Sequence, residues 1–129
     1  MIEKELIKLV ANSKKFGLSK NCTEKITVHN RICGDEITLG INKEKTEIFF
    51  DTKGCILTQA SAVILTENFI NLDKKKFNTY KKYISDALKN KQRLPNELKK
   101  FNKILIKDFK NREECITLPF KACIKLLND

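Results

Sequence analysis

The spacing of the apolar residues changes twice along this chain, and this change constrains the fold more than any other feature. Apolar residues recur at helical spacing in residues 2–10, alternate with a period of two in residues 25–51, and return to helical spacing after Cys55. Strands that alternate in this way bury one face and leave the other in water. We therefore predict an α+β fold, in which a three-stranded antiparallel sheet has helices packed on one face.

The three predicted strands are short and separated by polar residues. Residues 42–45, Asn-Lys-Glu-Lys, indicate a turn between the second and third strands. The alternating apolar positions that define the strands are Ile26 and Val28, then Ile37, Leu39 and Ile41, then Ile48 and Phe50.

The helical segments have recognisable start and stop signals. The first helix is expected to end near Ser13, and Thr58 is expected to cap the second. Pro119 has no amide hydrogen and is tolerated in a first turn, so the last helix is expected to begin between Cys115 and Leu118. The later apolar stripes are Ala60, Val63, Ile64 and Phe69; Phe77, Tyr80, Ile84, Ala87 and Leu88; Leu98, Phe101 and Leu105; and Ile116, Phe120, Cys123 and Leu127.

Length and composition favour a single domain over residues 1–129. The chain is 41% hydrophobic, which allows a real core, and it is short for two domains. The residues after Met1 lack the build of a signal peptide, and no apolar run approaches the roughly 20 residues that cross a bilayer. The five cysteines are an odd set without regular disulfide spacing. We predict a soluble, cytoplasmic protein with reduced thiols and no membrane partner.

The net charge of +10 raises the question of nucleic-acid binding. Only three of the 26 basic residues are arginines, and the abundance of lysine, asparagine and isoleucine is what AT-rich codons produce. Lysine runs such as residues 74–76 and 81–82 lie on a helical pattern whose apolar residues occupy other positions. The lysines are therefore predicted to form a solvated face, and nucleic acid is not expected as a partner.

Three cysteines occupy positions that a simple buried thiol does not require. Cys33 stands in the sequence Cys-Gly-Asp, Cys55 follows a glycine, and Cys115 lies near the start of the last predicted helix. Amide hydrogens at a helix N-terminus favour the thiolate, which is the form that binds metals and attacks sulfur. With Asp35, the cysteines can supply three sulfurs and one oxygen to a tetrahedral metal ion. Taken one at a time, each could instead be a core thiol, and Asp35 could merely close a turn.

Three segments of the chain resemble the iron–sulfur scaffold family known as NifU-N, IscU or SufU. They are residues 30–35, NRICGD; residues 54–62, GCILTQASA; and residues 109–115, FKNREEC. The resemblance extends from about Lys25 to Leu127 and is closest to the SufU branch, which has a longer stretch between its second and third cysteines. Residues 90–110 look like that insertion.

This resemblance implies a metal site and a role in sulfur transfer. In the SufU branch, three cysteines and the aspartate of the Cys-Gly-Asp motif bind zinc, and the protein accepts persulfide sulfur from a cysteine desulfurase. Carried over by motif, the zinc ligands are Cys33, Asp35, Cys55 and Cys115. Cys33 is then the expected sulfur acceptor, and Arg112 matches an arginine that lies near the third cysteine in that branch; these two are the expected catalytic residues. The implied partners are a SufS-like desulfurase and downstream iron–sulfur assembly proteins.

Two other functions fit parts of the same pattern. The protein could be a scaffold that assembles and transfers a [2Fe–2S] cluster, with the same ligands holding iron. Scaffolds of the IscU branch have a histidine immediately before the third cysteine, whereas this chain has Glu114, and this difference favours the zinc-dependent role. The third possibility is a basic binding module whose cysteines are structural.

The remaining candidate residues have simpler interpretations. Cys123 falls on an apolar stripe and is expected in the core, whereas Cys22 is expected to be an incidental exposed thiol in a polar loop. His29 flanks a strand and is expected at the surface. Glu114 is expected to be a first-turn helix residue and not a metal ligand, because carboxylates are favoured near helix N-termini. Arg112 has the alternative role of balancing the glutamates that follow it.

Overall fold

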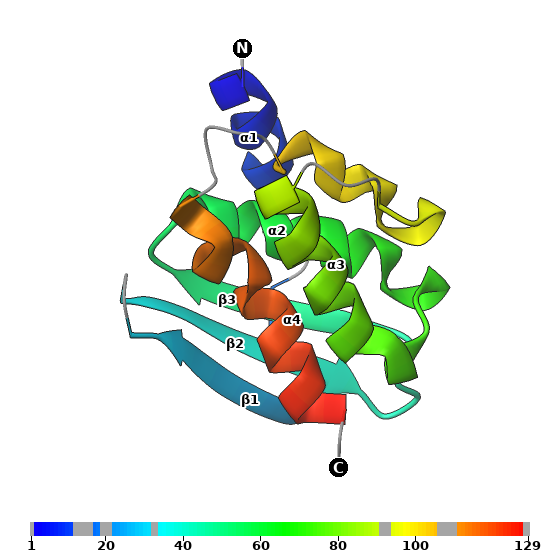
Figure 1. Ribbon diagram of the computed structural model, residues 1–129. Helices are drawn as coiled ribbons and strands as arrows, with labels where there is room; N and C mark the ends of the chain where they lie inside the picture. The colour runs from blue at the N-terminus through cyan, green and yellow to red at the C-terminus, as the bar shows by residue number, and fades with distance from the viewer. Residues whose placement is uncertain are drawn as a thin grey trace.

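The predicted sheet is present as an antiparallel meander with the strand order β1-β2-β3 (Figure 1). The computed structural model describes residues 2–11, 17–18, 22–31, 34–90, 94–105 and 111–127. The strands are β1 (Cys22–Asn30), β2 (Asp35–Asn42) and β3 (Ile48–Lys53). The prediction of three short antiparallel strands is confirmed.

The turn between β2 and β3 is organised by the side chain of Asn42. Its Oδ1 accepts hydrogen bonds from the amides of Thr46 and Glu47 at 2.9 and 3.0 Å. Its Nδ2 donates to Thr46 Oγ1 at 2.9 Å. Asparagine is favoured in turns because its side chain can bond to nearby backbone in this way. The turn predicted at residues 42–45 is therefore confirmed.

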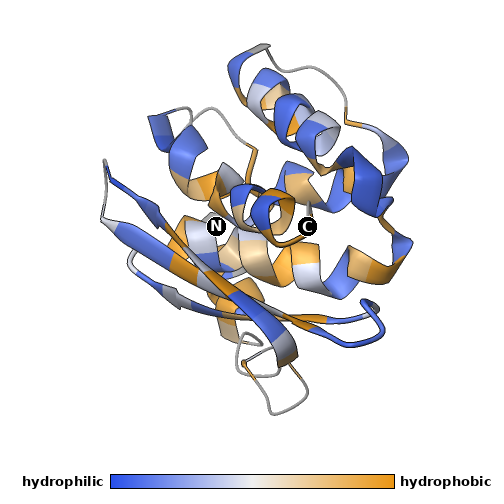
Figure 2. Ribbon diagram, turned by 90° about the horizontal axis from the view of Figure 1, so that it is seen from below, coloured by the Kyte–Doolittle hydropathy of each residue, from blue (hydrophilic) through white to orange (hydrophobic). Residues whose placement is uncertain are grey.

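One face of the sheet is buried and the other is wet, as the alternation along β2 requires. Ile37, Leu39 and Ile41 are at most 1% exposed, while Glu36 and Thr38, on either side of Ile37, are only half-buried. Seen from below, the sheet forms one layer and the helices form the other (Figure 2). Asp35 lies two residues before Ile37, so the period of two puts it on the helix-facing side of β2.

The helices form the second layer, which confirms the predicted α+β fold with helices on one face. They are α1 (Ile2–Ala11), α2 (Ile56–Asn68), η2 (Phe69–Asn71), η3 (Lys74–Lys76), α3 (Phe77–Asn90), η4 (Asn96–Lys103) and α4 (Glu113–Leu127). α4 packs against β1 and β2 as well as α2 and α3, so it joins the two layers. Across the described ranges, no helix has both the length and the apolar composition that a bilayer span requires.

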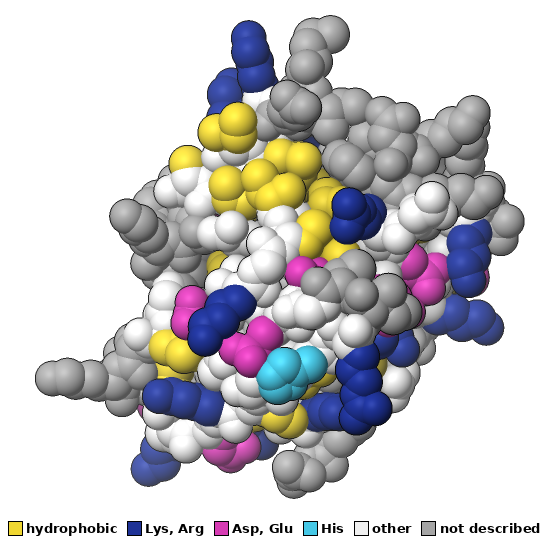
Figure 3. All heavy atoms as spheres, turned by 90° about the vertical axis from the view of Figure 1, so that its left-hand side faces the viewer, with side chains coloured by type: hydrophobic (Ala, Val, Ile, Leu, Met, Phe, Trp, Pro, Cys, Tyr) yellow, Lys and Arg dark blue, Asp and Glu magenta, His cyan; other side chains and the backbone are white. Residues whose placement is uncertain are grey.

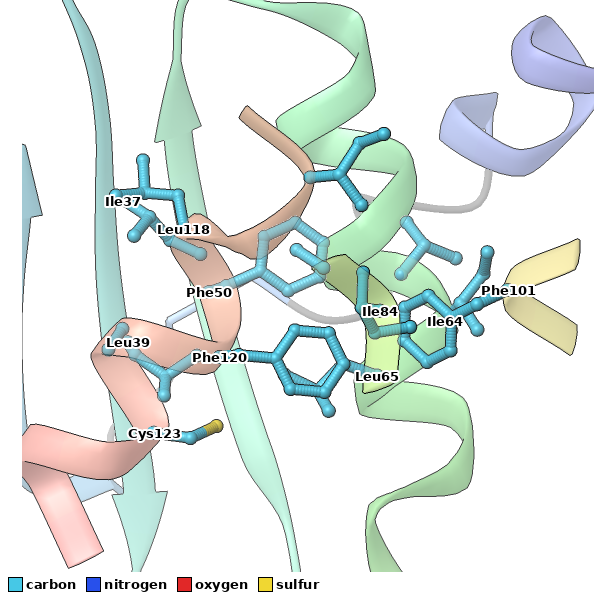
Figure 4. Packing of buried hydrophobic residues seen from close by; sticks show 14 of the residues in the cluster. Ile37, Leu39, Phe50, Ile64, Leu65, Ile84, Phe101, Leu118, Phe120 and Cys123 are labelled. Atoms are coloured by element: carbon cyan, nitrogen blue, oxygen red, sulfur yellow. The ribbon is translucent and has the colours of Figure 1, made fainter. Parts of the chain in front are cut away.

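The core is centred on α4, where its apolar stripe meets both layers. Phe120 is fully buried, and its ring centroid lies 5.2 Å from that of Phe101 and 6.3 Å from that of Phe77. Figure 4 shows the labelled residues of β2 on one side of Phe120 and those of α2 and α3 on the other. Aromatic pairs at these separations add to the free energy gained by burying their area.

The segment after Pro95 is helical as predicted, but its geometry is different. η4 is a 3₁₀ helix, in which residues three apart lie one above the other. Leu98, Phe101 and Ile104 follow this spacing and are at most 1% exposed. The stripe predicted from α-helical spacing ended at Leu105, which is only partly buried. Because of the tighter 3₁₀ spacing, Ile104 faces the core where Leu105 was expected.

The start of α2 lies earlier than the sequence indicated. Cys55 is the N-cap, and its Sγ accepts a hydrogen bond from the amide of Leu57 at 3.4 Å. The prediction that Thr58 caps this helix is therefore wrong. A thiol can accept the first-turn hydrogen bond that a hydroxyl usually accepts, so the helix begins before the preferred capping residue is reached. Thr58 is instead fully buried in the first turn.

The start of α4 also lies earlier than predicted. The helix begins at Glu113, so Pro119 stands in its interior and not in its first turn. A proline there deprives the carbonyl four residues before it of its helical donor. That carbonyl belongs to Cys115, and the hydroxyl of Thr58 donates to it at 3.0 Å. The predicted start was wrong because a tertiary hydrogen bond replaces the helical one.

Cys22 begins β1 and does not lie in a loop. It pairs with Asn42 across the β1–β2 ladder and is half-buried, so the prediction of an incidental exposed thiol is wrong. A Cβ added to Gly40 would lie 2.7 Å from Cys22 Sγ, which shows that the thiol packs over a backbone position without a side chain. The polar residues after Cys22 conceal the strand because this part of β1 is mostly exposed.

Cys123 is fully buried, as predicted, and its burial makes stability depend on pH. Burial raises the pKa of the Cys123 thiol above its ordinary value. Above about pH 8.5 the unfolded chain releases this proton while the folded protein keeps it, so the free energy of unfolding falls as pH rises, by at most about 1.4 kcal/mol per pH unit for this group. We expect urea unfolding under reducing conditions to show this fall between about pH 8 and pH 10.

The control for this prediction is Cys123→Ala, which removes the thiol and leaves the other titrating groups in place. Its stability should fall less over the same pH interval than that of the unsubstituted protein. Equal slopes in the two proteins would contradict the assignment to Cys123.

Candidate metal centre

One carboxylate and two thiols meet at one end of the sheet. Asp35, Cys55 and Cys115 each offer one ligand atom, and these three atoms lie within 4.8 Å of one another. Asp35 begins β2, Cys55 caps α2, and Cys115 lies in the first turn of α4. The structure therefore brings together three of the four ligands predicted from the sequence. The fourth, Cys33, lies outside the described residues.

Asp35 is buried and receives hydrogen bonds from both helices that approach it. The backbone amide of Cys55 donates to Oδ1 at 2.8 Å, and the thiol of Cys115 donates to Oδ2 at 2.9 Å. The hydroxyl of Thr58 lies 3.4 Å from Oδ2. A buried carboxylate is costly unless it has such partners. These bonds hold the carboxylate beside the Cys115 thiol and the start of α2.

Cys55 is the most accessible of the three groups. It is half-buried at the start of α2, where its Sγ accepts the amide hydrogen of Leu57. Partial positive charge gathers at a helix N-terminus, and it stabilises an anion placed there. Cys55 therefore lies at a helix N-terminus, as the sequence indicated.

Cys115 is fully buried, and Asp35 and Asn30 contact its sulfur. Besides the bond to Asp35, Asn30 Nδ2 lies 4.0 Å from Cys115 Sγ, at the limit for a hydrogen bond to sulfur. Asn30 and Asp35 are directly opposed in the β1–β2 ladder. The last residue of β1 and the first residue of β2 therefore both point to the thiol of α4.

Gly54 leaves the space that Asp35 occupies. Its φ of +112° is a conformation that residues with a side chain rarely adopt. A Cβ built on Gly54 would collide with Asp35 Oδ1. Glycine at this position therefore lets the backbone before α2 approach the carboxylate closely enough for the amide of Cys55 to bond it.

The donor set suits zinc or iron. Cysteine sulfur and a carboxylate oxygen are both common zinc ligands, and tetrahedral sites use four of them. Thiolates are equally the usual ligands of iron–sulfur clusters. In the sequence, Cys33 lies two residues before Asp35 and could supply a fourth ligand without a long connection. The residues present fit such a metal site.

Two other polar residues predicted from the sequence, Glu114 and His29, have side-chain partners at the surface. Glu114 lies in the first turn of α4, as predicted, and Lys121 Nζ lies 2.5 Å from its Oε2. His29 is 62% exposed in its side chain and lies 2.7 Å from Glu36, which confirms the surface position predicted for it. Figure 3 shows the histidine among acidic and basic side chains on this face. Neither residue belongs to the cluster of three ligand atoms.

Arg112 lies immediately before α4 and is exposed. It stands three residues before Cys115 in the sequence, so it lies near the helix end that carries this thiol. Its catalytic role stays a prediction.

Sequence reasoning missed three residues that build the site: Asn30, Gly54 and Thr58. Asn30 and Gly54 lie within the motifs that indicated the family, but their roles depend on contacts with Cys115 and Asp35 across the fold. For Thr58 a signal existed: Pro119 stands four residues after Cys115 and frees its carbonyl. That signal could show that a donor was needed but not which residue supplies it.

A family model described as the NifU-like N terminal domain matches residues 1–115. The chain belongs to this family. The resemblance to NifU-N, IscU and SufU proteins found in the sequence is therefore confirmed. The matched residues include all four predicted ligands.

A curated relative and two crystal structures are similar to this member of the family. Over 74 residues the chain is 39% identical to the iron–sulfur cluster assembly scaffold protein IscU of Thermotoga maritima; the match spans 54% of this chain and about half, 52%, of that relative. A protein of Fervidobacterium islandicum, described as an iron–sulfur cluster assembly scaffold for the SUF system, is 27% identical with a TM-score of 0.78 and covers 99% of this chain and 98% of its own.

The second crystal structure shows the shared fold alone. A NifU-like N-terminal protein of Brucella abortus is 23% identical, with a TM-score of 0.74 over 96% of this chain and 92% of its own. The three-stranded sheet with its helical layer is therefore a fold that this chain shares with solved proteins of its family.

We predict that Gly54→Ala destabilises the protein more than Gly34→Ala does. Both glycines have a positive φ, for which an alanine costs roughly 1–2 kcal/mol. A Cβ on Gly34 would meet nothing within 4 Å, whereas one on Gly54 would displace the Asp35 carboxylate. Urea unfolding of the two variants measures the difference. Equal losses would show that the carboxylate is not held in place by the backbone of Gly54.

Proposed function

We propose that this protein is a zinc-dependent sulfur acceptor, which receives persulfide sulfur from a cysteine desulfurase in the cytoplasm for iron–sulfur cluster assembly. The observation that carries the proposal is the convergence of Asp35, Cys55 and Cys115 in a member of the NifU-like N-terminal family. The ligand set is completed by Cys33, which the Cys-Gly-Asp motif supplies. Downstream iron–sulfur assembly proteins are the expected recipients of the sulfur.

The residues of the site can hold zinc and keep its ligands in order. Zinc bound to cysteines stabilises their thiolate forms, which are the reactive forms in sulfur transfer. Asp35 Oδ2 accepts a hydrogen bond from the Cys115 thiol, so the oxygen and the sulfur that would bind zinc already lie side by side. The amide of Cys55 holds the carboxylate in this orientation.

The sulfur-transfer step follows from thiol–disulfide chemistry. The Cys33 thiolate attacks the terminal sulfur of the persulfide on the partner desulfurase. A new sulfur–sulfur bond forms on Cys33, the partner's own sulfur–sulfur bond breaks, and its cysteine leaves as a thiolate. The step needs no external oxidant or reductant. We assign Arg112 to the same site as an exposed cation that can attract the anionic persulfide.

A second candidate function is that of a cluster scaffold. The relatives from Thermotoga maritima and Fervidobacterium islandicum are both described as iron–sulfur cluster assembly scaffold proteins. In that role iron and sulfide are the cargo, and the same thiols and carboxylate hold a [2Fe–2S] cluster until it is transferred.

The metal content of anaerobically purified protein distinguishes the two candidates. We expect about one zinc per chain and no acid-labile sulfide, because three sulfurs and one oxygen form a closed tetrahedral site. Cys55→Ala should lose most of the zinc, since it removes one of these ligands. Elemental analysis together with a sulfide assay measures both quantities.

Cys123→Ala is the matched control for this measurement. It removes a buried thiol of α4 that lies outside the ligand cluster, so it should keep its metal. Iron with matching sulfide in the unsubstituted protein would favour the scaffold function. The absence of metal from every sample would contradict both candidates.

We further predict that Cys33→Ser strongly reduces acceptance of sulfur. A serine hydroxyl cannot form the new sulfur–sulfur bond, so transfer of radiolabelled sulfur from a SufS-type desulfurase should fall roughly tenfold or more. Cys22→Ser is the control, because Cys22 packs over Gly40 and is not one of the grouped ligand residues. Labelling of the Cys33→Ser protein at the rate of the unsubstituted protein would show that another residue is the acceptor.

A further inference from the structure

The interior proline of α4 removes a helical hydrogen-bond donor beside the candidate metal centre. Pro119 has no amide hydrogen, so the carbonyl of Cys115 lacks the donor that a regular helix would provide. Both Cys115 and Thr58 are fully buried. The Thr58 hydroxyl donates to this carbonyl at 3.0 Å. A buried carbonyl left without a donor is unfavourable, so this bond holds the first turn of α4 against α2.

The same hydroxyl lies close to a second candidate ligand. Thr58 Oγ1 is 3.4 Å from Asp35 Oδ2, and the helix that carries Thr58 begins at Cys55. A hydroxyl has one hydrogen, and the shorter distance assigns it to the Cys115 carbonyl. Thr58, a residue of α2, therefore contacts both Asp35 at the start of β2 and the first turn of α4. Figure 1 shows α2 and α4 in the same helical layer, and the two helices contact each other.

We propose that Thr58 is a positioning residue of the metal centre, and this inference rests on the proposed metal site. By replacing the donor that Pro119 lacks, Thr58 sets the place of the Cys115 thiol relative to Cys55 and Asp35. Groups outside the ligand shell that orient the ligands commonly change metal affinity 10- to 100-fold when they are removed.

Ser61 provides a matched comparison one turn further along α2. Its hydroxyl donates to the carbonyl of Ile116 at 2.6 Å, so it also joins α2 to α4 in a fully buried place. The helical donor for that carbonyl is the amide of Phe120, which is not a proline. Ser61→Ala therefore removes a buried bond between the same helices at a carbonyl that keeps its helical donor.

The test uses zinc affinity and the visible absorption spectrum of the cobalt-substituted protein, which reports the ligand geometry. Thr58→Val keeps the shape of the side chain and removes the hydroxyl. We expect it to weaken zinc binding roughly 10- to 100-fold and to change the cobalt spectrum. Thr58→Ser keeps the hydroxyl, and Ser61→Ala loses only the bond to the Ile116 carbonyl. The zinc affinity of both variants should therefore be within about threefold of that of the unsubstituted protein.

Pro119→Ala provides a rescue in the Thr58→Val background. The alanine restores an amide hydrogen that can donate to the Cys115 carbonyl within α4, so the double variant should regain most of the affinity and the original cobalt spectrum. Loss without rescue would overturn the assignment to this carbonyl. Equal losses in Thr58→Val and Ser61→Ala, or no loss in Thr58→Val, would overturn the positioning role.

A metal-free measurement separates this inference from the proposed function. In the apo protein, the rate at which an alkylating reagent modifies Cys115 reports how firmly the first turn of α4 is held, and Cys123 on the same helix is the internal reference. Thr58→Val should raise the Cys115 rate roughly tenfold or more and leave the Cys123 rate unchanged. If the unsubstituted protein binds no metal, the proposed metal site fails, and an unchanged Cys115 rate in Thr58→Val would overturn the positioning role by itself.

Discussion

The buried carboxylate of Asp35 is the group on which the arrangement of the site depends. A carboxylate inside a protein is tolerated only when hydrogen-bond donors surround it. Here the donors are the backbone amide of Cys55 and the thiol of Cys115, which come from two different helices. Satisfying one side chain of β2 therefore requires α2 and α4 to begin at the same end of the sheet. The thiols that the proposed chemistry needs are brought together by this same requirement.

Both helix starts depart from regular capping, and both departures serve the site. A cysteine caps α2, so the group that stabilises the helix end is also a candidate metal ligand. Pro119 interrupts the hydrogen bonding of α4 one turn after Cys115, and a hydroxyl of α2 makes up the missing bond. Local irregularity is often concentrated at functional sites, because it is maintained only where the surroundings compensate for it. The irregular first turn of α4 is compensated by the helix that carries Cys55.

Much of the fold could be predicted because it follows from local periodicity. The alternation of Ile37, Leu39 and Ile41 specified β2 and its buried face, and the same period placed Asp35 on that face. Helix boundaries were less predictable. The thiol of Cys55 replaced the expected cap, and η4 adopted 3₁₀ spacing that brings Ile104 into the core in place of Leu105. The strand that begins at Cys22 was hidden because β1 is largely solvated there.

By itself, the sequence determined the α+β class, the one-sided sheet, the family and the residues that can hold a metal. These depend on periodicity and on the motifs around three cysteines, and both are local properties of the chain. Only the tertiary structure decided that Asp35, Cys55 and Cys115 meet within 4.8 Å, that Gly54 makes room for the carboxylate and that Thr58 replaces the donor missing at Pro119. Asp35 and Cys115 alone are 80 positions apart. The contacts between these residues arise from the packing of α2 and α4 on the sheet. That packing cannot be read from the spacing of residues along the chain.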